Sequence, residues 1–142
     1  MSNDLLGLGV ALWLLAALLA LAVRPAIVAR VPLALGSAAT AAGAVLALPA
    51  GGDVTHLPLG VAGAGLDFVL KPSAAWLLFF GLIPATLAAI LGTPSSKGRT
   101  AWCFGAASGL IGAVGVFGLQ DGFGLLVAWE LMSLGGAVMI LS

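Results

Sequence analysis

The fold is decided by the stretch from Phe123 to Ser142, FGLLVAWELMSLGGAVMILS, which contains a single charged residue, Glu130. A helix needs about 20 mostly apolar residues to cross the hydrocarbon core of a bilayer. At that depth a carboxylate costs roughly 2.5–3.5 kcal/mol on insertion scales. Chains seldom carry that cost without a partner, a water cavity or a proton to move. Glu130 is therefore the first candidate functional residue.

The whole chain has the same apolar character. It has 142 residues, of which 62% are hydrophobic and 7% are charged, whereas a soluble domain is about 25% charged. Five basic and five acidic residues balance one another, and no basic patch indicates a nucleic-acid partner. The composition is typical of an integral membrane protein, with the lipid bilayer as its first partner.

Five segments have the length and composition of membrane spans, and the predicted helices cover about residues 5–23, 31–50, 72–92, 101–119 and 123–142. Residues 57–71, between the second and third helices, are too short and too rich in glycine for another span. They predict a short hairpin or an interfacial segment. Because Asp4 precedes the first apolar run and Arg24 follows it, we expect a retained first span and not a cleaved signal peptide. The predicted fold is one all-α membrane domain.

The loop charges predict the orientation. Arg24 and Arg30 lie between the first two spans, and Lys97 and Arg99 lie between the third and fourth. The positive-inside rule places these loops in the cytoplasm and the N-terminus outside. The expected location is a bacterial inner membrane. The fifth helix then runs inward, and Glu130 lies about 10 Å below Phe123.

A row of glycines marks the fourth span. Gly105, Gly109 and Gly112, with Gly115 and Gly118 after them, lie at short regular intervals, and the first two form a GxxxG pair. Such a row lets another helix approach closely. The alternative is that glycine is merely tolerated in an apolar chain rich in alanine and glycine.

Few other residues are candidates for chemistry. His56 is the only histidine and Cys103 the only cysteine. We expect His56 to be a solvated loop residue near Asp53 and not a metal ligand, because a metal site would need further ligands. We therefore expect no catalytic residue, no metal site and no cofactor in this chain.

We also have expectations for four more polar residues. Asp121 is placed to cap the start of the fifth helix, where an acid suits the helix dipole, and a role in proton entry is the alternative. Ser133 is one turn from Glu130 and within reach of a hydrogen bond to it. Asp67 and Lys71 are four residues apart and are expected to pair at the membrane surface.

The segment from Ala128 to Leu134, AWELMSL, follows a short acidic loop. It resembles the fifth helix of the antiporter-like, proton-conducting membrane subunits of complex I, of Mrp-type cation/proton antiporters and of membrane-bound nickel–iron hydrogenases. The sequence of this segment is most similar to that of the large antiporter-like subunit of hydrogenase 4 and formate hydrogenlyase, component B. The likeness is specific over about Gln120 to Ser142 and extends loosely, through topology and loop charge, over the whole chain.

The resemblance implies a role for one residue. In that family the fifth-helix glutamate pairs with a lysine on a later, broken helix, and Glu130 would take up or gate protons in response to it. Family members have many more helices, so we expect this chain to be the N-terminal portion of a larger subunit. It would couple a hydrogenase or complex I-like assembly to the movement of protons, or of sodium, with the redox chemistry in other subunits.

Two alternatives stay open. One is a stand-alone antiporter-family subunit that exchanges sodium for protons or supports inorganic carbon uptake. The other is a small membrane scaffold, in which the glycine row docks partner subunits and Glu130 serves assembly.

Overall fold

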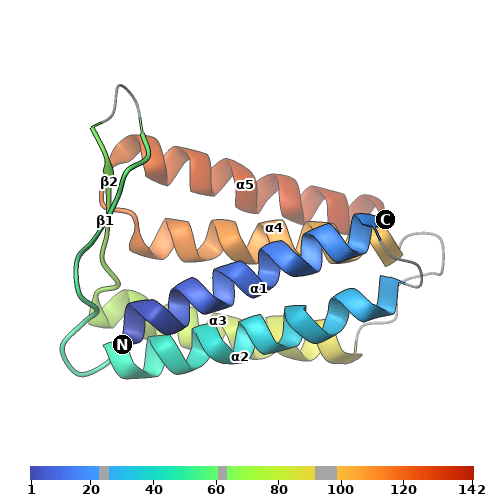
Figure 1. Cartoon of the computed structure of the whole chain (residues 1–142), viewed down its shortest axis with the longest axis horizontal. Helices are drawn as coiled ribbons and strands as arrows, with labels where there is room; N and C mark the ends of the chain where they lie inside the picture. The colour runs from blue at the N-terminus through green and yellow to red at the C-terminus, as the bar shows by residue number, and fades with distance from the viewer. Residues whose placement is uncertain (23–25, 61–63, 92–98) are drawn as a thin grey trace.

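The computed structural model describes residues 1–22, 26–60, 64–91 and 99–142. Successive long helices run in opposite directions along one bundle axis (Figure 1). The helices are α1 (Ser2–Ala22), the short 3-10 helix η1 (Ala26–Ala29), α2 (Arg30–Ala47), α3 (Pro72–Leu91), α4 (Arg99–Gly118) and α5 (Gly122–Leu141). The expectation of a mostly helical chain with five long helices is confirmed.

Four of these helices, α1, α2, α4 and α5, are long and apolar enough to cross a membrane. By length and composition the chain is therefore an integral membrane protein. The described part of α3 offers a shorter apolar segment, Pro72–Ala88, with Pro84 in the helix interior. The third predicted span, residues 72–92, is present as the helix α3, while its passage through the membrane stays a prediction.

Two helix boundaries differ from the predicted ones by three residues, and the other described boundaries differ by at most two. The first helix begins at Ser2, three residues before the predicted start, and so includes the polar residues Ser2, Asn3 and Asp4. The second ends at Ala47 and not at residue 50. Gly51, with a φ of 83°, donates its N–H to the Ala47 carbonyl and turns the chain away. The predicted ends at residues 23 and 92 lie outside the described residues.

A small hairpin closes one end of the bundle. Strands β1 (Thr55–Leu57) and β2 (Leu66–Phe68) pair antiparallel, so the predicted hairpin is present and begins two residues earlier than residue 57. The β2 side is fixed to the α4–α5 connection by backbone hydrogen bonds, from Val69 N–H to Gly118 O at 2.8 Å and from Gln120 N–H to Asp67 O at 3.0 Å.

The α1–α2 contact holds the largest fully buried side chain of the described core, Trp13. Its indole N–H donates to the Leu33 carbonyl at 3.1 Å. The ring lies so close to Gly36 that a Cβ there would stand 2.7 Å from it. Because a buried indole N–H without a partner would be costly, this bond fixes how the two helices meet.

The two ends of the bundle differ in charge. The N-terminus, the hairpin and the start of α5 lie at one end, and the first residues of α2 and α4 lie at the other (Figure 1). Four acidic residues therefore gather at the hairpin end: Asp4, Asp53, Asp67 and Asp121. Arg30 and Arg99 begin α2 and α4 at the opposite end. This is the alternation that the loop sequence predicts; Arg24 and Lys97 lie outside the described residues.

Candidate functional site: the outward face of α5

Glu130 lies near the middle of α5. It is eight residues beyond Gly122, which is about 12 Å along a helix that rises 1.5 Å per residue. Leu141 lies eleven residues further on, about 16 Å. If α5 crosses a bilayer, the carboxylate lies too deep for its short side chain to reach either headgroup layer.

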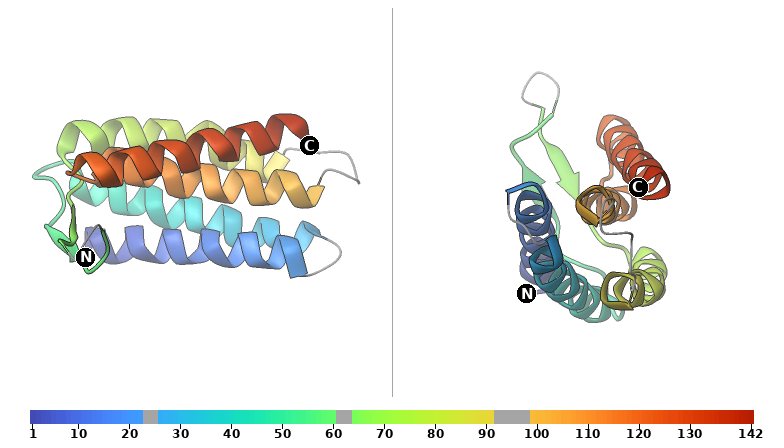
Figure 2. Two further views of the ribbon diagram at one scale, coloured as in Figure 1. Left: turned by 90° about the horizontal axis from the view of Figure 1, so that it is seen from above. Right: turned by 90° about the vertical axis from the view of Figure 1, so that its right-hand side faces the viewer.

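The Glu130 side chain points away from the rest of the bundle. Seen end-on, α5 lies at the edge of the bundle beside α4 (Figure 2). Among the described elements, α4 is its main packing partner. Glu130 is exposed, and so are the residues one turn before and after it, Leu126 (65%) and Leu134 (61%). Within the part of the chain that the structure describes, Glu130 makes no hydrogen bond and no ion pair.

Glu130 is thus an exposed carboxylate in the middle of an apolar helix, with no partner among the described residues. Hydrocarbon gives it no hydrogen-bond donor, and intramembrane acids accordingly face protein or a water-filled cavity. The outward face of α5, defined by Leu126, Glu130, Ser133 and Leu134, is therefore the surface on which any partner of Glu130 must lie.

The opposite side of α5 packs against α4, and this contact turns the Glu130 face outward. A Cβ on Gly112 would overlap the Met132 backbone nitrogen and lie 2.7 Å from the Ala128 carbonyl oxygen, and a Cβ on Gly105 would lie 2.7 Å from the Gly135 oxygen. At both positions the α4 backbone lies directly against α5. A Cβ on Gly109 would meet its nearest atom at 3.8 Å, while a Cβ on Gly135 would lie 2.7 Å from the Gly109 Cα, so Gly109 also contacts α5.

Asp121 is the N-cap of α5, as its position predicts. Its Oδ1 accepts from the Gly124 N–H at 2.7 Å, and its other oxygen is buried without a hydrogen-bond partner among the described residues. Asp121 and Glu130 are nine residues apart, about 13 Å along the helix and half a turn out of phase. The structure does not bring these two carboxylates together.

Ser133 is exposed on the same face as Glu130, but its hydroxyl donates to the Trp129 carbonyl at 2.9 Å. Its only proton is used within its own helix. A supporting role for Ser133 would therefore need a change of rotamer, or acceptance of a hydrogen bond from a protonated Glu130.

Sequence reasoning missed two contacts at the hairpin. His56 Nδ1 lies 2.8 Å from Asp67 Oδ1, because the two residues face each other across β1 and β2. The expected pair of Asp67 with Lys71 is therefore not formed, and Asp67 pairs with His56 instead. Asn3 Nδ2 donates to Thr55 Oγ1 at 2.7 Å and to the Asp53 carbonyl. The hairpin register would have revealed the first contact, whereas the second depends on how α1 meets the hairpin.

No group of three or more His, Cys, Asp and Glu residues is placed to hold a metal ion within the described ranges. Cys103 is buried against Ala20 and Ala29.

Comparison with protein families, with curated proteins and with solved structures finds no match for this chain. The fold and composition thus define a class, a helical integral membrane protein, and the function must be argued from the site.

Proposed function

We propose that this chain is the N-terminal bundle of a proton-translocating membrane subunit and that Glu130 is its proton-relay residue. The observation that carries the proposal is the position of Glu130, exposed and unpaired in the middle of an apolar helix. Intramembrane acids commonly mark the paths of ions and protons.

The sequence supports the same role. AWELMSL around Glu130 resembles the fifth helix of the antiporter-like subunits, where the glutamate answers a lysine on another helix. The outward face of α5 is free to receive such a helix, since α5 packs mainly against α4 in the described chain. The redox chemistry would belong to other subunits of a hydrogenase or complex I-like assembly, and the transported ion would be the proton.

The charge of the two ends supports an orientation. Arg30 and Arg99 begin helices at the end away from the hairpin, whereas Lys71 is the one basic side chain at the hairpin end among the described residues. The positive-inside rule places the hairpin end outside the cytoplasm. In this orientation α5 runs inward, and α3 crosses the membrane in addition to α1, α2, α4 and α5.

The second candidate is a scaffold that docks partner subunits. The observation in its favour is the apolar surface around Glu130, where Trp129 is 54% and Val127 is 53% exposed. A glutamate on such a surface would serve assembly by forming one buried hydrogen bond with a partner.

Replacing Glu130 with Gln separates the two functions. Gln keeps the size and the hydrogen-bonding ability of Glu but cannot exchange a proton. In membrane vesicles that contain the whole assembly, the relay predicts lost proton pumping, followed with a pH-sensitive dye, while the subunits still co-purify. Normal pumping by Glu130→Gln would refute the relay. Failed co-purification would favour the scaffold. Ser142→Ala is the control, since it removes a hydroxyl that bonds within the last turn of α5, far from Glu130.

A further inference from the structure

The α4–α5 turn, residues 118–121, is bonded to the hairpin. Leu119 pairs with Phe68 in an antiparallel bridge, and one backbone hydrogen bond lies on each side of this pair. Phe68 also pairs with Thr55 of β1. The β2 strand therefore lies between β1 and the α4–α5 turn.

The side chain of Gln120 adds two further bonds to this contact. Its Nε2 donates to the Gly118 carbonyl at 2.8 Å and to the Val69 carbonyl at 3.2 Å. Gly118 is the last residue of α4, where a helix leaves its carbonyls without intrahelical partners. Since an amide nitrogen has two hydrogens, both are used, one towards α4 and one towards the hairpin.

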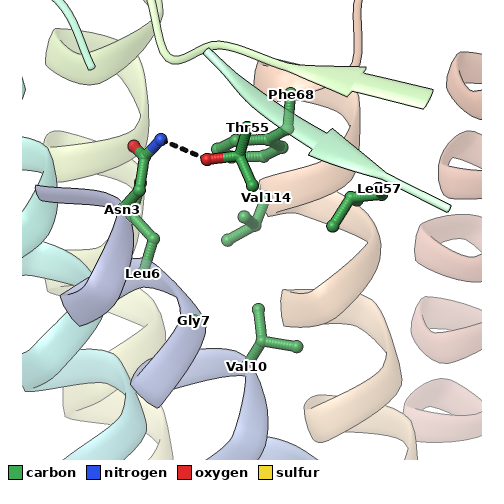
Figure 3. A pocket seen from close by; sticks show the side chains of 8 residues that line it. All are labelled: Asn3, Leu6, Gly7, Val10, Thr55, Leu57, Phe68 and Val114. Atoms are coloured by element: carbon green, nitrogen blue, oxygen red, sulfur yellow. Dashed lines mark hydrogen bonds between the residues drawn. The ribbon is translucent and has the colours of Figure 1, made fainter. Parts of the chain in front are cut away.

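The hairpin also contacts α1. Asn3, near the start of α1, donates to Thr55 Oγ1 of β1 (Figure 3). On the β2 side, the Phe68 ring lies so close to Gly118 that a Cβ on Gly118 would overlap it. The hairpin thus joins α1 to the α4–α5 turn.

Helix α5 begins directly after the Gln120 contact. Asp121 is the N-cap of α5 and Gly122 is its first residue, so no residue separates Gln120 from the cap. Among the described elements, α5 packs mainly against α4. The position of α5 relative to α1, α2 and α3 therefore depends on α4 and on the turn that Gln120 holds.

The start of α5 controls where Glu130 lies. Glu130 is ten residues beyond Gln120, about 15 Å along the helix. A tilt of α5 by about 10° about its start would move Glu130 by about 2.5 Å. That is several times the range of distances over which an N–H···O hydrogen bond forms.

We propose that Gln120 is a positioning residue, which bonds the α4–α5 turn to the hairpin and so fixes the depth and direction of Glu130. The inference rests on the proposed function of Glu130, because a relay partner must meet the carboxylate at one depth and on one face of α5. Gln120 itself touches neither the proton nor that partner.

Two variants remove the Gln120 bonds in different ways. Gln120→Ala deletes the amide, whereas Gln120→Glu keeps its size but, when ionised, has no hydrogen to donate. Ser108→Ala is the matched control. It also removes a side-chain hydrogen bond to a backbone carbonyl, that of Gly105, but this bond lies within α4 and does not involve the hairpin.

Distances between two nitroxide labels measure the position of α5 directly. The full chain is placed in dioleoylphosphatidylcholine vesicles, with labels on Leu14→Cys of α1 and Leu126→Cys of α5, both exposed, and with Cys103 replaced by Ala. Both Gln120 variants should widen the distance distribution at least twofold, and Ser108→Ala should leave it unchanged. An unchanged distribution in both Gln120 variants would overturn the proposal, and so would equal widening with Ser108→Ala.

Proton pumping separates the positioning role from a merely structural one. In vesicles that contain the whole assembly, both Gln120 variants should lower the number of protons moved per electron transferred several-fold. A merely structural defect would lower the amount of assembled complex and leave this ratio unchanged.

The same vesicles distinguish this inference from the relay itself. An unchanged ratio in both Gln120 variants, together with lost pumping by Glu130→Gln, would overturn the positioning role and leave the relay standing. Normal pumping by Glu130→Gln would refute the relay, and the positioning role that rests on it would fall too, whatever the label distances show about α5.

Discussion

Two alanine substitutions on α4 should have different effects although the sequence makes them look alike. Gly109 and Gly112 lie one turn apart in the same helix, and both belong to the predicted glycine row. Replacing either with Ala should favour the helix by about 0.5–1 kcal/mol, because Ala loses less conformational freedom on folding than Gly.

The structure separates the two substitutions through the space at each Cβ. At Gly109 the nearest atom, the Met132 carbonyl oxygen, would lie 3.8 Å away, an ordinary contact. At Gly112 the new methyl group would overlap the Met132 nitrogen, and the Ala128 oxygen would lie 2.7 Å away. These are backbone atoms of α5, so they cannot rotate aside and the helices must separate. Overpacking of this kind typically costs about 1–3 kcal/mol.

We therefore expect Gly109→Ala to be neutral or slightly stabilising and Gly112→Ala to be less stable than Gly109→Ala by about 1–3 kcal/mol. Since 1.4 kcal/mol is a factor of ten in an equilibrium constant, the difference is measurable. The only cysteine, Cys103, is buried on α4, so a thiol-reactive fluorophore reports unfolding in detergent micelles without an engineered label. Equal stability of the two variants would refute the packing of α4 against α5 described here.

The remaining predictions concern the hairpin and the start of α5. Asn3→Ala removes two hydrogen bonds that join α1 to the hairpin and the segment before it, each worth about 0.5–1.5 kcal/mol. Amide hydrogen exchange at Thr55–Leu57 should become faster, while exchange in α3 stays unchanged. Unaltered exchange at β1 would contradict the contact. Asp121→Ala removes the cap of α5, at about 1 kcal/mol. Because the variant also removes a buried oxygen without a partner, we expect a smaller net loss, visible as faster exchange of the Gly124 amide; Asp121→Asn should keep the slow exchange.

Part of the candidate site could be predicted from sequence. Glu130 stands out because one charge interrupts twenty apolar residues, and Asp121 precedes a helix start with a residue type that favours capping. Both expectations depend on local sequence. By contrast, the contacts of His56 and Asn3 join positions distant along the chain. Single-sequence patterns contain no information on such pairs.

The sequence by itself determined the class of this protein, because helix length and apolar composition are set by the thickness of a bilayer and by the need to satisfy every backbone group within it. It also determined where along α5 the carboxylate lies. Only the tertiary structure decided that Glu130 faces outward and that a Cβ would overlap α5 at Gly112 but not at Gly109. Those outcomes depend on how helices rotate and cross, which packing between distant segments fixes.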